Sequence, residues 1–382
     1  MKGKIIAFAS ILTLFCSTMN YAQSYVLDES KYKDALDLIF SFQMKEAIDK
    51  TRELKKKDIN DPACYFLEAV ILYYTSIIQK KELSDELYSS NYIKKEFDNN
   101  IEKAIEIVKQ FLKADNSNNG LRLILASSYD FQGLFALNHD EFMNFYKKEK
   151  EGREEINKIL NSDKNYYDAY LGAGLYNLFS SLAPWYIRWL ISSDGKDEGL
   201  MQMQKAIDNA KYNFTKYFAM MFLDSFYYLE YLDDKDKNTL QARIDILEKF
   251  LTVYTDNFAV KLALASCYEI VNQNKAIQLY SEVIDYAKKR NNERLFNYAS
   301  YFLGEYFFEK NDRDKAFVFF NNVLSISRSE GIMKERSIIK LAEIYTINGD
   351  KKKAISLLDE VISKTTDKKV KRTAVELKDK IE

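Results

Sequence analysis

The sequence reads Asn-Lys-Ala-Ile at residues 274–277, Asp-Lys-Ala-Phe at residues 314–317 and Lys-Lys-Ala-Ile at residues 352–355. The central alanines, Ala276, Ala316 and Ala354, therefore recur about every 40 residues. The same pattern of a polar residue, Ala and an apolar residue occurs upstream around Ala47, Ala104 and Ala206. This period is typical of repeat proteins in which each unit is a helix, a short turn and a second helix.

A second pattern precedes several of these alanines and explains how the two helices of a unit would pack. It is a Leu followed by a small residue, with an aromatic residue three or four positions later, and it occurs as Leu303-Gly304 with Phe307 and as Leu341-Ala342 with Tyr345. Small residues let two helix axes approach closely, and the surrounding large side chains fill the groove that results.

The composition favours an all-α fold. The 382 residues include only 11 Gly and 2 Pro, which is too little turn material for a many-stranded sandwich or barrel, and the 28 Tyr and 25 Phe need a packed core. One apolar stripe at helical spacing is formed by Ile101, Ala104, Ile105, Val108 and Leu112. Clusters of Asp and Asn between the units, and Pro62, are typical of helix starts.

The C-terminal units resemble tetratricopeptide repeats (TPRs). Leu303-Gly304-x-x-Phe307 followed by Ala316, Phe320 and Val323 has the TPR pattern, and the match extends over residues 258–364. The resemblance implies a right-handed solenoid of about eight helical hairpins over residues 23–366, with second helices near residues 47, 104, 156, 206, 246, 276, 316 and 354. Residues 367–382 would form a capping helix, with Val370, Ala374, Leu377 and Ile381 on its apolar side.

Residues 1–22 have the layout of a secretory signal peptide. Lys2 and Lys4 precede an apolar run over residues 5–15, and small and polar residues follow. We expect cleavage near Gln23. No later stretch of 18 apolar residues is present, so no transmembrane span is expected in the mature chain. The expected location is the periplasm or the cell envelope.

One insertion interrupts the repeats at about residues 183–200 and contains both tryptophans, Trp185 and Trp189. Its residues 185–191 are apolar nearly all round, which predicts that they are covered by protein, by a ligand or by a membrane interface. The surrounding residues 166–212 resemble an exported bacterial branch of TPR proteins of unassigned function. At greater distance they are similar to the inclusion-body clearance family. That family acts inside cells, so the export signal argues against the same role here.

The sequence offers little material for catalysis or cofactor binding. His139 is the only histidine, which argues against a zinc helix or a Ser-His-Asp triad. Gly172 and Gly174 lie inside a helical pattern, where they predict close helix packing and not a dinucleotide site. Cys64 and Cys267 are interpreted as buried thiols. The formal net charge of −1 provides no basic field for nucleic acid. We therefore expect no cofactor, no metal site and no enzymatic activity.

The expected binding surface is a concave groove lined by the first helix of each unit. Acids and aromatic residues prevail among its candidate positions, which suits an extended peptide with Lys or Arg side chains. Alternatively, the acids form a solvated face and the tyrosines pack between repeats. With the two tryptophans, the candidate partner-binding residues are Asp130, Tyr176, Asn177, Trp185, Trp189, Glu269, Tyr298, Tyr301, Glu305, Phe308, Arg336 and Glu343.

These features predict an exported, non-enzymatic TPR scaffold that binds another protein or peptide, with envelope assembly or secretion as the candidate process. Two alternatives remain open from the sequence. A periplasmic or surface glycan-binding repeat protein would show clustered exposed aromatic residues. A glycosidase built on a helical α/α toroid would show two carboxyl groups about 5 to 10 Å apart in a deep cleft.

Overall fold

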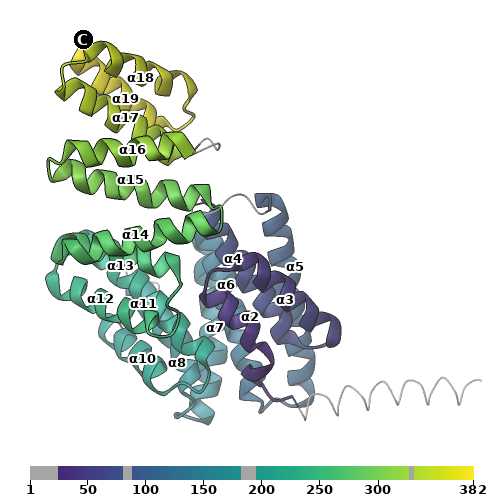
Figure 1. Ribbon diagram of the computed structural model, residues 1–382. Coiled ribbons are helices and arrows are strands. Elements are labelled where there is room, and N and C mark those ends of the chain that lie inside the picture. The colour runs from purple at the N-terminus through teal and green to yellow at the C-terminus, as the bar shows by residue number, and fades with distance from the viewer. Residues whose placement is uncertain (1–24, 81–87, 182–194, 327–330) are drawn as a thin grey trace, which may run out of the picture. The chain divides into compact units, whose positions relative to one another are not determined.

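The computed structural model describes residues 25–80, 88–181, 195–326 and 331–382 (Figure 1). These residues form 17 α-helices and two short 3₁₀-helices, and no strand occurs among them. The all-α prediction is therefore confirmed. The predicted signal peptide, Trp185 and Trp189 lie outside the described residues. No helix in the described ranges is both long enough and apolar enough to span a membrane.

The chain divides into two compact units, which we describe separately. Of the described residues, unit 1 contains those in the ranges 25–75 and 88–254, and unit 2 contains those in the ranges 76–80 and 255–382. The helices up to residue 254 are η1 (Glu29–Tyr32), α2 (Lys33–Phe40), α3 (Met44–Lys57), α4 (Pro62–Lys80), α5 (Ser90–Ala114), α6 (Asn119–Asn138), α7 (Phe142–Ser162), η2 (Tyr167–Ala169), α8 (Tyr170–Ser181), α10 (Lys196–Asn209), α11 (Asn213–Asp234) and α12 (Lys237–Leu251).

Unit 2 contains seven consecutive helices, each packed against the next (Figure 1). They are α13 (Phe258–Val271), α14 (Gln273–Lys289), α15 (Glu293–Glu309), α16 (Arg313–Ile326), α17 (Ile332–Ile347), α18 (Lys351–Lys364) and α19 (Lys368–Ile381). Helix α19 also contacts α17, and it buries Val370, Ala374 and Ile381 against its neighbours. The apolar side of the predicted capping helix is therefore the side that packs.

The alanines that define the sequence repeat are all in helix interfaces. Their side chains are at most 1% exposed, and they lie on α3, α5, α10, α14, α16 and α18: Ala47, Ala104, Ala206, Ala276, Ala316 and Ala354. Residues 156 and 246, the other two predicted markers, lie on α7 and α12. All of these eight helices except α5 pack against the described helix directly before them, and this hairpin-like packing makes the described fold a TPR-like helical repeat.

The small residue of the second pattern has a direct packing reason in unit 2. A Cβ placed on Gly304 of α15 would lie 2.6 to 3.0 Å from three ring atoms of Phe320 on α16. Only glycine leaves room for the Phe320 ring at this distance from the α15 backbone. The Leu-Gly dipeptide therefore marks a point of close contact between the two helices of this hairpin.

The predicted capping residues begin the helices as expected. Asn118 Oδ1 accepts the N–H of Leu121 at 3.0 Å, and Asn257 Oδ1 accepts the N–H of Val260 at 2.9 Å. Pro62 is the first residue of α4, directly after Asp61, whose Oδ1 accepts the N–H of Ala63 at 3.1 Å. Cys64 and Cys267 are buried thiols, as the sequence predicted.

Candidate functional site

The candidate site is a row of side chains on α13, α15 and α17, the first helices of the three hairpins in unit 2. We call it the α13/α15/α17 face. It contains seven of the predicted residues, together with two that sequence reasoning did not select, Glu309 and Lys340. The predicted members are Glu269 on α13, Tyr298, Tyr301, Glu305 and Phe308 on α15, and Arg336 and Glu343 on α17.

The centre of this face is a hydrogen-bonded network between α15 and α17. Tyr301 Oη donates to Glu305 Oε2 at 2.8 Å, one turn along the same helix. Lys340 Nζ lies 3.0 Å from Glu305 Oε1 and 3.4 Å from Glu343 Oε1. Burial of Tyr301 and the negative charge of Glu305 raise the pKa of the tyrosine hydroxyl above its ordinary value, so it stays a hydrogen-bond donor.

Aromatic rings surround this network. The Lys340 ammonium lies 4.9 Å from the centre of the Phe308 ring, and the Arg313 guanidinium of α16 lies 4.0 Å from the same ring. The Tyr298 and Phe302 rings lie 4.8 Å apart along α15, and both are half-buried. The face thus already shows the cation–ring contacts that a bound Lys or Arg side chain would use.

Carboxyl groups crowd the α13 side of the face. Glu269 Oε1 accepts a hydrogen bond from Tyr280 Oη of α14 at 2.8 Å. Burial raises the pKa of Glu269 above its ordinary value, and the charges of Glu309 and Glu305 raise it further, although the Tyr280 hydrogen bond works against this rise. Among the nine residues of the face, four are acids and two, Arg336 and Lys340, are bases, so acids outnumber bases.

The three candidate residues of unit 1 are in the interior and not on an open groove. Asp130, Tyr176 and Asn177 are 7%, 8% and 2% exposed. Asn177 Nδ2 donates to Gln202 Oε1 of α10 at 2.9 Å, and the guanidinium of Arg153 on α7 covers the Tyr176 ring at 4.3 Å. Close packing of α6, α7, α8 and α10 covers positions that the repeat pattern alone assigned to an exposed surface.

Asp130 is instead half of a buried pair of acids that sequence reasoning missed. Its partner is Glu149 on α7, which is 2% exposed. Burial raises the pKa of Asp130 to about 8, and burial together with the charge of Asp130 raises that of Glu149. The available signal was Asp-x-x-Gly at residues 130–133 and Glu-x-x-Gly at residues 149–152.

This acid pair does not fit the glycosidase alternative. Glycoside hydrolysis needs one carboxyl group to reach the glycosidic oxygen and another to reach the sugar or a water molecule. Asp130 and Glu149 lie between packed helices, and neither lines a pocket described below. Within the described ranges, no group of three or more His, Cys, Asp or Glu side chains is arranged to hold a metal ion.

Comparisons with known proteins give no assignment. No family model and no curated protein matches the chain. The solved structures it resembles include a human IFIT1 dimer with PPP-AAAA, at 14% identity and a TM-score of 0.49, which spans 88% of this chain and 68% of IFIT1. Yeast Tom70 has 13% identity and a TM-score of 0.39, over 95% of this chain and 90% of Tom70.

The type IV pilus biogenesis factor PilW is a third similar structure. It has 11% identity and a TM-score of 0.40, and the match spans 66% of this chain and 98% of PilW. These similarities are too distant to transfer a binding partner or a role to this chain.

Proposed function

We propose that this chain is a non-enzymatic helical-repeat scaffold that binds an extended, positively charged segment of another protein through the α13/α15/α17 face. The observation that carries the proposal is that Glu269, a largely buried acid whose pKa is raised mainly by its burial, also feels the negative charges of Glu309 and Glu305 on the neighbouring helix α15. A Lys or Arg side chain placed among these three carboxyl groups would offset their repulsion and form charge-assisted hydrogen bonds.

The half-buried rings beside the acids support the same ligand. Tyr298, Phe302 and Phe308 provide apolar surface on α15 next to the carboxyl groups. A cationic side chain is attracted both to a carboxylate and to the face of an aromatic ring, so these groups would add to each other's contribution. The peptide backbone would lie across successive first helices, each of which would contribute side chains to the contact.

A charge-matched pull-down from an envelope extract tests this proposal. One variant carries Glu269→Gln, Glu305→Gln and Glu309→Gln. The control carries Asp285→Asn, Glu376→Gln and Asp379→Asn, which remove the same charge from exposed positions on α14 and α19. We expect the control to retain the wild-type partners and the face variant to lose them, while circular dichroism shows both variants folded. Identical partners for both variants would contradict the proposal.

We further propose that the protein is exported, with the mature chain beginning near Gln23 and a role in envelope assembly or secretion. Cleavage there would leave intact the segment from Tyr25 onward, which makes specific contacts with unit 1. The layout of residues 1–22, with Lys2 and Lys4 before an apolar run, supports this location. Mass spectrometry of the purified native protein should give an N-terminus near residue 23. A protein that retains residues 1–22 in the cytoplasmic fraction would refute export.

A further inference from the structure

Residues 25–32, which we call the N-terminal strap, lie across unit 1 like a bound peptide. Asp28 has extended backbone dihedral angles, and η1 follows it. The side chains alternate: Tyr25 is buried and Leu27 and Glu29 are half-buried, whereas Val26, Asp28 and Ser30 are exposed. An extended chain shows this period of two when one of its sides lies against a surface.

Tyr25 and Tyr32 attach the two ends of the strap to the start of α4. Tyr25 Oη donates to Asp61 Oδ1 at 3.4 Å, and Tyr32 Oη donates to Asp61 Oδ2 at 2.5 Å. Asn118, the N-cap of α6, donates from Nδ2 to the carbonyl oxygen of Tyr25 at 2.9 Å. Side chains at the beginnings of two helices therefore hold the strap by specific hydrogen bonds.

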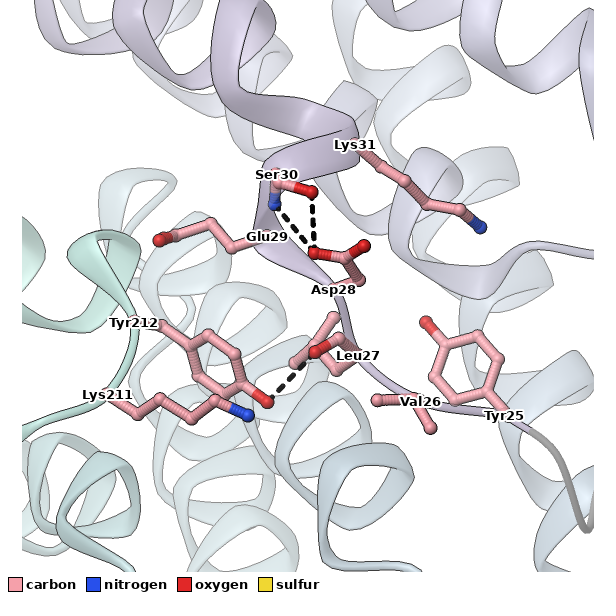
Figure 2. Close-up of a pocket in the computed structure, with 9 residues that line it drawn as sticks. All are labelled: Tyr25, Val26, Leu27, Asp28, Glu29, Ser30, Lys31, Lys211 and Tyr212. Carbon is pink, nitrogen blue, oxygen red and sulfur yellow. Dashed lines mark hydrogen bonds between the residues drawn. The ribbon is translucent and has the colours of Figure 1, made fainter.

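The middle of the strap is held by the loop before α11 (Figure 2). Tyr212 Oη donates to the carbonyl oxygen of Leu27 at 3.1 Å, and the Leu27 side chain packs against the apolar cluster that includes Leu123 and Tyr212. Extended peptides bind their receptors in this way, through a backbone carbonyl that accepts a hydrogen bond and an apolar side chain, here the half-buried Leu27, that packs against the surface.

Glu29 completes the attachment by capping α11. Its carboxylate accepts the N–H of Asn213 at 2.9 Å and the N–H of Phe214 at 2.6 Å, more than 180 residues away in sequence. Tyr212, the residue at the N-cap position, makes no side-chain capping hydrogen bond of its own. A carboxylate is the preferred partner for free N–H groups at a helix start, because the helix dipole also favours negative charge there.

Two spaces adjoin the strap. An apolar cavity of about 50 Å³ is lined by strap residues and by Leu36, Phe66, Leu123 and Phe214 among others. An open pocket of about 630 Å³ is lined by residues 25–31, Lys211 and Tyr212 (Figure 2). A segment beside unfilled space loses fewer contacts on leaving than a segment in a close-packed core.

We propose that the strap occupies a peptide-binding site on unit 1. The site takes an extended segment with an aromatic, an aliphatic and an acidic side chain at alternate positions, as Tyr25, Leu27 and Glu29 provide. The chain's own N-terminal segment keeps the site closed until a segment of the same pattern displaces it. This inference concerns unit 1 and does not depend on the α13/α15/α17 face of unit 2.

Supplying the strap in trans tests this inference. In the full chain with Leu27→Asp and Glu29→Ala, we expect the strap to leave its site. Leu27→Asp places a charge in the apolar cluster, and Glu29→Ala removes the carboxylate that caps α11. A fluorescent peptide of residues 25–32, acetylated and amidated at its ends, should bind this variant saturably. It should not bind the matched control Val26→Lys, because Val26 is 71% exposed and its replacement leaves the strap seated.

The peptide's own sequence provides the specificity control. A Val26→Lys peptide should bind the double variant within about threefold of the wild-type peptide, and a Leu27→Asp peptide should bind at least about tenfold more weakly. Equal binding of the Val26→Lys and Leu27→Asp peptides to the double variant would overturn the inference. A folded double variant that does not bind the wild-type peptide would overturn it too.

If the double variant does not fold, amide hydrogen exchange in the wild-type chain shows whether the strap opens separately from the rest of unit 1. If the strap opens while the rest of unit 1 stays folded, the amide hydrogens of Asn213 and Phe214 should exchange much faster than those of Leu125 and Ala126 in the middle of α6. Equal protection of both pairs would show that the strap is an inseparable part of unit 1, and the inference would fail.

Discussion

The carboxyl group of Asp130 on α6 lies in the space that a side chain at position 152 of α7 would occupy, because Gly152 has none. Glu149 on α7 has the reciprocal relation with α6: a Cβ on Gly133 would lie 2.8 Å from Glu149 Oε1. Gly172 of α8 makes room for the second oxygen of Asp130. Two buried acids are thus accommodated by three glycines on three neighbouring helices.

Replacing Gly152 by Ala should destabilise unit 1 by about 2–4 kcal/mol, because the methyl group overlaps the Asp130 carboxyl and approaches the Ala126 carbonyl oxygen at 3.3 Å. Urea unfolding followed by circular dichroism measures this change. The control is Gly120→Ala on α6, where the nearest atoms are at 3.4 Å, and we expect a change below about 1 kcal/mol. Equal effects of the two substitutions would contradict the packing described here.

The buried acid pair should make stability fall as the pH rises from about 4 to about 8. The pKa values of Asp130 and Glu149 are raised by burial, so the folded chain holds protons that the unfolded chain releases in this range. Each proton released on unfolding lowers the free energy of unfolding by at most about 1.4 kcal/mol per pH unit. Tyr73 of α4 also faces the pair, and its pKa is raised by burial and by the charge of Glu149.

The variant Asp130→Asn isolates this dependence, since the amide has nearly the same shape and does not titrate. The difference in unfolding free energy between the wild type and Asp130→Asn should decrease from pH 4 to pH 8. The exposed substitution Glu376→Gln should leave the wild-type profile unchanged. A difference that increases with pH would mean that Asp130 is ionised in the folded chain.

Glu68 on α4 is a buried carboxylate that depends on two cations of α3. Its side chain is 1% exposed, Arg52 Nε lies 2.7 Å from Oε1, and Lys55 Nζ contacts Oε2. Lys55→Met should cost about 1–3 kcal/mol because it removes one partner of a buried charge. Lys50→Met, which breaks an exposed pair with Asp34, should cost less than about 1 kcal/mol. Similar unfolding midpoints for the two variants would argue against this ion-pair network.

Gly304→Ala should destabilise unit 2 by about 1–3 kcal/mol, because its methyl group would press on the Phe320 ring. A smaller residue at position 320 should relieve the overlap. The double variant Gly304→Ala/Phe320→Leu should therefore be more stable, by about 1 kcal/mol, than the sum of the two single changes predicts. Strict additivity in a double-mutant cycle measured by thermal unfolding would show that the two residues do not compete for this space.

The repeat architecture could be predicted from the sequence because it depends on short-range regularities. Helical period, small residues at a spacing of about 40 and capping residues such as Asn118 and Asn257 are all local, and each constrains the backbone wherever it occurs. The seven predicted members of the α13/α15/α17 face come from the same regularity, since they keep fixed offsets from the small residues Ala265, Gly304 and Ala342 on the first helices.

Only the tertiary structure decided which of the remaining polar groups meet. Lys340 joins Glu305 to Glu343 across two helices, Glu29 caps a helix that begins more than 180 residues later, and Asp130 is buried against Gly152. Such contacts depend on how closely particular helices approach, which is set by the summed packing of many side chains and leaves no periodic signal in the sequence. Local pattern therefore determined the hairpins, whereas long-range packing decided which charges are buried, paired or exposed.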